Sequence, residues 1–77
     1  NANVYPNPTF ANSSFQINSD EEIVSVTVFD ILGNKVLEKT TASFNTVIGT
    51  DNFTKGCYTV HVTGKQNNRA ITKIVIQ

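Results

Sequence analysis

A chain of 77 residues has room for one small domain with a single hydrophobic core. Six lysine and arginine residues balance six aspartate and glutamate residues, which excludes the dense positive surface that nucleic-acid binding requires. The lone cysteine, Cys57, excludes an intrachain disulfide. No stretch approaches the roughly 20 apolar residues of a membrane-spanning helix, so direct membrane insertion is not expected.

The first part of the chain predicts an edge strand, a proline segment and a core strand. Residues 1–3 are expected to be a linker remnant before a short edge strand at Val4-Tyr5. Because proline fixes φ and donates no amide hydrogen bond, Pro6-Asn7-Pro8 is expected to be a stiff extended or turn segment. Ser14 to Ile17 alternates apolar and polar residues like a half-buried strand, and Asn18 to Glu21 is polar turn material.

The clearest strand runs from Ile23 to Asp30. Strand alternation predicts that Val24, Val26 and Val28 share one face. Apolar residues on both faces at its ends indicate a central strand in a two-layer structure. Gly33 is predicted to take a positive φ in the reversal that follows, and Lys35 to Lys39 returns as the partner strand.

The rest of the chain continues as short strands and loops. A loop is predicted at Thr40 to Ser43, a strand at Phe44 to Ile48, and an irregular segment at Gly49 to Lys55 whose Phe53 plugs the core. The next strand opens at Gly56 and points Tyr58, Val60 and Val62 one way; a polar hairpin tip at Gly64 to Asn68 then leads to a final strand at Ala70 to Ile76.

Six or seven short strands, with turn signals between them and no sustained helical period, predict an all-β domain. The expected fold is an antiparallel β-sandwich of immunoglobulin-like type. Residues 1–77 are expected to form this single domain. Since no disulfide supports so small a core, we expect only marginal stability.

Residues that could perform chemistry are few. Cys57 and His61 lie four residues apart on one predicted strand, hence about 13 Å apart, whereas a nucleophile and its base must approach within about 3 Å. Asp20-Glu21-Glu22 and Asp51-Asn52 offer oxygen atoms for Ca²⁺ but lack an alternating ligand spacing. The acidic run is interpreted as a solvated turn. No catalytic residue, metal site or cofactor is therefore predicted.

Four features follow one another in a fixed order. They are Val4-Tyr5-Pro6-Asn7-Pro8, the apolar strand that ends in the turn at Gly33, the strand Gly56-Cys57-Tyr58, and the terminal Lys73-Ile74-Val75-Ile76-Gln77. This ordered set resembles the type A C-terminal sorting domain of the type IX (Por) secretion system of Bacteroidetes, over essentially the whole chain. Cys57, His61 and the terminal Gln77 depart from the usual residues of that family.

The resemblance implies a secretion signal that itself performs no reaction. It implies passage through the periplasm, recognition by the type IX translocon at the outer membrane, and a final location at the cell surface or outside the cell. N-terminal cargo domains and a sortase-like peptidase, which in many members removes the domain and attaches the cargo, are the implied partners. The implied recognition residues are Tyr5, Pro6, Asn7, Pro8, Gly33, Gly56, Tyr58, Lys73, Ile74, Val75, Ile76 and Gln77.

Three alternatives remain open at the level of sequence. Pro6-Asn7-Pro8 can be a rigid entry to the first strand or a recognition feature. The last strand can be an ordinary terminal strand or an exposed edge that pairs with a receptor strand. The whole chain can also be an immunoglobulin-like accessory module that binds glycan or packs on a neighbouring catalytic domain. Because no secretory leader is present and Asn1 is not an initiator, we expect the parent protein to be longer.

Overall fold

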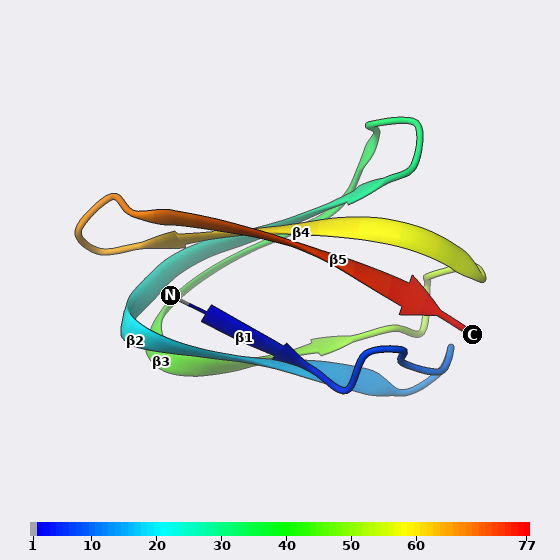
Figure 1. Cartoon of the computed structure of the whole chain (residues 1–77), viewed down its shortest axis with the longest axis horizontal. Coiled ribbons are helices and arrows are strands. Elements are labelled where there is room, and N and C mark those ends of the chain that lie inside the picture. Colours follow the sequence, from blue (N-terminus) through cyan, green and yellow to red (C-terminus); the bar gives the residue numbers. More distant parts are fainter. Residues whose placement is uncertain (1) are drawn as a thin grey trace.

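The computed structural model describes residues 2–77, which form five antiparallel β-strands (Figure 1). Strand β2 lies at the centre and pairs with β1, β3 and β4, while β5 pairs with β4. All these pairings are antiparallel. The strand bounds are β1 Ala2–Tyr5, β2 Ser14–Asp30, β3 Lys35–Gly49, β4 Gly56–Gly64 and β5 Arg69–Ile76.

Two long strands bend and thereby build both layers of the sandwich. The first part of β2 pairs with β1 and with the end of β3, whereas its second part pairs with β4 and the start of β3. The register between β2 and β3 shifts between Asn18 and Ile23, and such irregularities bend a strand. In Figure 1 both strands curve round together at one end of the molecule. The predicted all-β immunoglobulin-like sandwich is confirmed.

The strand count differs from the expected six or seven because two predicted breaks lie inside continuous strands. Asn18 to Glu21, expected to be a turn, belongs to β2, and the predicted loop at Thr40 to Ser43 belongs to β3. Polar residues are typical of turns, but here they mark a bend at which the chain changes layer without reversing. Residues 2 and 3, expected to be linker, belong to β1 and pair with Ser19 and Asn18; residue 1 lies outside the described residues.

The core lies between the two layers. Tyr58, Val60 and Val62 point into it as predicted, and Phe53 fills it from the β3–β4 loop. Val24 is only half-buried, contrary to the predicted face, because the register shifts between Ile23 and Ser25 and places Ile23 inside. The buried apolar residues are Phe15, Ile17, Ile23, Val26, Val28, Ile48, Phe53, Tyr58, Val60, Val62, Ile74 and Ile76.

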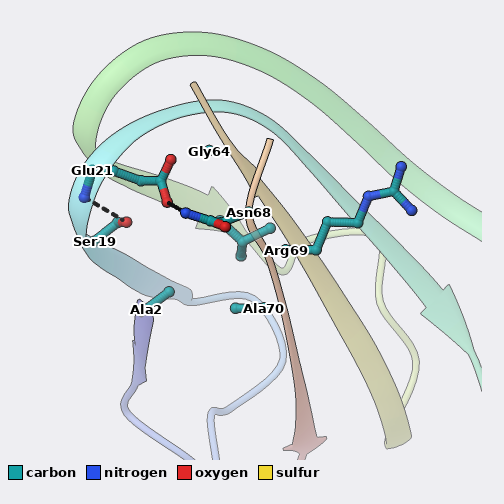
Figure 2. Close-up of a pocket in the computed structure, with 8 residues that line it drawn as sticks. Ala2, Ser19, Glu21, Gly64, Asn68, Arg69 and Ala70 are labelled. Atoms are coloured by element: carbon teal, nitrogen blue, oxygen red, sulfur yellow. Dashed lines mark hydrogen bonds between the residues drawn. The ribbon is translucent and has the colours of Figure 1, made fainter. Parts of the chain in front are cut away.

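The acidic run at the bend of β2 holds the β4–β5 hairpin tip in place. The carboxylate of Glu21 accepts a hydrogen bond from the backbone amide of Gln66 at 2.9 Å. It accepts a second from the side-chain amide of Asn68, also at 2.9 Å (Figure 2). The backbone amide of Lys65 also donates to the carbonyl of Glu22 at 2.7 Å. The interpretation of this run as a solvated turn is wrong for Glu21. A side chain at Gly64 would overlap the Glu21 carboxyl group.

Candidate functional site

The structure brings the N-terminal proline segment and the terminal strand together. The side chain of Asn7 donates from Nδ2 to the carbonyl of Lys73 at 2.9 Å, and its Oδ1 accepts from the amide of Val75 at 3.1 Å. A carboxamide offers one donor and one acceptor side by side, as a peptide unit does. Asn7 therefore takes the place of a neighbouring strand along the edge of β5.

Backbone hydrogen bonds extend this contact to the end of the chain. The amide of Thr9 donates to the carbonyl of Val75 at 2.9 Å, and the amide of Gln77 donates to the carbonyl of Thr9 at 2.8 Å. The amide of Ala11 donates to the carbonyl of Gln77 at 2.8 Å. Residues 7–11 thus lie along the outer edge of β5, and we call this segment the clasp. Figure 1 shows it passing beside the C-terminus.

Two buried threonines anchor the clasp to the core. Thr9 is 1% exposed and its hydroxyl donates to the carbonyl of Pro6. Thr50 is fully buried, and its hydroxyl donates to the carbonyl of Phe10 at 2.8 Å and accepts from the amide of Ser13 at 2.9 Å. Buried hydroxyl groups require such partners. Neither threonine could be singled out from the sequence, because nothing local distinguishes them from the other polar residues between the strands.

Residues 5–8 and β5 together present an exposed surface. Tyr5, Pro6, Asn7 and Pro8 are exposed, although the peptide bonds before both prolines are cis and the segment is held in place. Along β5, Lys73 and Val75 are exposed, with Gln77 beyond the strand end. Ile74 and Ile76 alternate with them and are buried in the core. Of the terminal residues expected to be recognised, only three therefore offer side chains to a partner.

The other expected recognition residues lie elsewhere. Gly33 has φ +88° and sits in the β2–β3 hairpin tip, which projects away from the clasp in Figure 1. The carboxylate of Asp30 accepts the amides of Leu32 and Asn34 in this tip, each at 2.9 Å. Gly56 begins β4, and Tyr58 is a core residue. The positive φ predicted for Gly33 is confirmed.

A shallow groove of about 330 Å³ lies between the β2–β3 tip and β5. Its lining residues are Asp30, Ile31, Cys57, Tyr58, Thr59 and Lys73. Cys57 is exposed, whereas the His61 ring, four residues along the same strand, packs edge-on against Phe29 with ring centroids 4.7 Å apart. Within residues 2–77, no group of three or more histidine, cysteine, aspartate or glutamate side chains could hold a metal ion. The described part of the chain also contains no helix long and apolar enough to span a bilayer.

Comparison with known proteins agrees with this architecture. A DUF3244 family protein from Bacteroides vulgatus, described as having an immunoglobulin-like β-sandwich fold, superimposes with a TM-score of 0.73 at 17% identity, covering 86% of this chain and 77% of that one. CopC from Methylosinus trichosporium OB3b gives a TM-score of 0.57 at 13% identity, covering 99% and 91% of the two chains. These likenesses establish the fold.

PorZ of Porphyromonas gingivalis, described as an essential surface component of the type IX secretion system, is a third similar structure. It gives a TM-score of 0.75 at 19% identity, and the match covers 99% of this chain but only 11% of PorZ. No curated protein sequence matches the chain. A family model for the secretion system C-terminal sorting domain matches residues 3–77. With that match over almost its whole length, the chain belongs to the family of secretion system C-terminal sorting domains.

Proposed function

We propose that this chain is a folded signal that directs an N-terminal cargo protein through the type IX translocon. The cargo would cross the periplasm with the domain attached and finish at the cell surface or outside the cell. A sortase-like peptidase would then remove the domain in the manner that the family resemblance implies. The family assignment favours this role over an accessory module that binds glycan.

The observation that carries the proposal is the clasp. The two ends of the family's ordered motif, separated by more than 60 positions, meet through the hydrogen bonds of Asn7 with Lys73 and Val75. A receptor that contacts this surface would therefore read both ends at once, and only when the domain is folded. This arrangement suits a signal that must be distinguished from an unfolded chain.

The chemistry of the side chains supports a role as substrate and not as catalyst. Cys57 and His61 occupy one strand, about 13 Å apart by strand geometry, and the ring of His61 packs on Phe29. The hydroxyl groups of Thr9 and Thr50 donate to the backbone carbonyls of Pro6 and Phe10. We infer that the domain acts by being bound.

The proposal is tested by fusing residues 1–77 behind a periplasm-directed reporter in a bacterium with an active type IX system. The reporter should appear at the cell surface or in the medium, and it should remain in the periplasm without the domain. Deleting Lys73 to Gln77 should also retain it, because the deletion removes the core residues Ile74 and Ile76. Export that is equally efficient after this deletion would contradict the proposal.

Substitutions of exposed side chains separate recognition from folding. Lys73→Ala and Val75→Ser leave the core residues of β5 intact and should slow export while the domain still unfolds cooperatively. Lys65→Ala, at the exposed tip of the β4–β5 hairpin, is the matched control and should export normally. If the reporter is exported equally well with Lys73→Ala, Val75→Ser and Lys65→Ala, the secretion machinery does not recognise the exposed face of β5.

A further inference from the structure

The clasp covers only part of the outer edge of β5. The carbonyl of Lys73 and both backbone groups of Val75 bond to the clasp, so these groups point away from β4. The β4–β5 register runs without a shift from Thr63↔Arg69 to Gly56↔Ile76. In an antiparallel ladder the outward groups recur at every second residue. The backbone groups of Arg69 and Ile71, and the amide of Lys73, therefore also face outward.

Among residues 2–77, none is hydrogen-bonded to this stretch of edge. Strand β5 pairs only with β4 among the described strands, and the clasp contacts begin at Lys73. The apolar side chain of Ile71 lies beside this edge and is 63% exposed. An open edge is a template for strand addition, in which backbone hydrogen bonds supply affinity and alternate side chains supply specificity.

The side chains along the open edge carry a distinct charge pattern. Arg69 and Lys73 flank Ile71 at alternate positions and are exposed with it. No ion pair with either cation occurs within residues 2–77. The nearby carboxylate of Glu21 binds Gln66 and Asn68, and Figure 2 shows the Arg69 side chain extending away from it. The open edge therefore presents a positive, an apolar and a positive residue in succession.

We propose that this edge takes up an extended segment of a secretion-machinery protein, with acidic side chains opposite Arg69 and Lys73 and an apolar side chain opposite Ile71. The inference rests on the proposed function for the origin of that segment. Its chemistry rests on cross-strand pairing, in which opposite charges stabilise and like charges destabilise. A second copy of this chain fits poorly, because antiparallel pairing of two β5 strands about Ile71 would place Arg69 against Lys73.

A peptide titration tests the charge pattern directly. The probes are the capped heptapeptide Thr-Glu-Thr-Val-Thr-Glu-Thr and its counterpart with lysine in place of glutamate, each added to the isotope-labelled chain at millimolar concentration. We expect saturable shifts of the amide resonances of Arg69, Ile71 and Lys73, with the acidic peptide bound about fivefold more tightly or better. Equal binding of the two peptides, or shifts confined to other residues, would overturn the proposal.

Matched variants locate the interaction. The double variant Arg69→Glu/Lys73→Glu should reverse the preference between the peptides, whereas Lys65→Glu at the exposed hairpin tip should leave it unchanged. Ile71→Pro should abolish binding because it removes an amide that points outward from the sheet. An edge strand tolerates proline at such a position. If Ile71→Pro fails to fold, the charge variants still decide. Retention of the acidic preference in the double variant would overturn the proposal, because Arg69 and Lys73 would then not select the peptide.

Export separates failure of this inference from failure of the proposed function. Arg69→Glu changes a residue outside the family's expected recognition set and should slow export of the fused reporter at least about threefold, while Lys65→Glu should not. If even the unmodified domain leaves the reporter in the periplasm, both the proposed function and this inference are wrong. If the unmodified domain and Arg69→Glu are exported at equal rates, the proposed function stands and the docking edge is wrong.

Discussion

Replacing Tyr58 tests the packing of the domain in a single position. Its side chain is 6% exposed, and its ring centroid lies 5.0 Å from that of Phe53. The hydroxyl donates to the carbonyl of Thr54 at 2.7 Å and lies 3.1 Å from the Thr54 hydroxyl. Tyr58 therefore joins the core to the irregular loop between β3 and β4.

The two parts of the side chain should contribute very differently. Tyr58→Ala leaves a cavity under the loop and should lower the free energy of unfolding by about 3–5 kcal/mol. Tyr58→Phe keeps the ring and loses only the hydroxyl contacts, which should cost about 1 kcal/mol. A chain of this length has a total stability of about 4–12 kcal/mol, so the alanine variant should be largely unfolded near the lower end of that range.

Urea unfolding followed by circular dichroism measures both variants. Ile71→Ala, which truncates an exposed side chain, is the control and should change stability by less than about 0.5 kcal/mol. A double-mutant cycle with Phe53→Ala should show a coupling of about 0.5–1.5 kcal/mol between the two rings. The reasoning is refuted if Tyr58→Ala unfolds at the same urea concentration as the parent.

Three other substitutions probe the turn, the bend and the clasp. Gly33→Val should cost more than about 1 kcal/mol in urea unfolding and Gly33→Asn less, because φ +88° strains a branched side chain; equal costs would contradict this. Gly64→Ala should cost about 1–3 kcal/mol by crowding the Glu21 carboxyl group, and adding Glu21→Ala should cost less than the sum of the two single changes. Asn7→Ala should cost about 1–2 kcal/mol and speed amide exchange at Val75; unchanged exchange would show that the clasp contact does not persist in solution.

Local patterns were sufficient to predict the fold class and most strand faces. Alternation placed Tyr58, Val60 and Val62 correctly in the core, and the isolated aromatic ring of Phe53 was correctly assigned as a core plug. These features depend on the period of a strand and on the apolar character of single residues. Both are visible within a few positions of sequence.

Features that depend on the bend were not predictable in the same way. Polar residues such as Asn18 read equally well as a turn or as a bulged strand, so β2 was divided and Val24 was assigned to the wrong face. The role of Glu21 depends on a hairpin tip more than 40 positions away. Only the packing of the whole domain brings these residues together.

Prediction of the candidate site from the sequence was limited in the same way. The family resemblance identified both ends of the motif, yet it gave no reason why Asn7 should matter beyond the stiffness of its two flanking prolines. Its carboxamide bonds to residues 66 and 68 positions further on. The terminal strand is consequently neither fully tied into the sheet nor fully exposed: its end is covered by the clasp, and its start is open.

The central claim is that the secretion machinery reads this chain as a folded unit. The most direct measurement compares export of a reporter fused to the parent domain with export of the same reporter fused to the Tyr58→Ala domain, and quantifies the intact fusion in the periplasm and outside the cell. We predict that the parent fusion leaves the cell while the intact Tyr58→Ala fusion accumulates in the periplasm. Export of both fusions at the same rate, with the Tyr58→Ala domain shown by circular dichroism to be unfolded, would show that a linear sequence is sufficient and would contradict this claim.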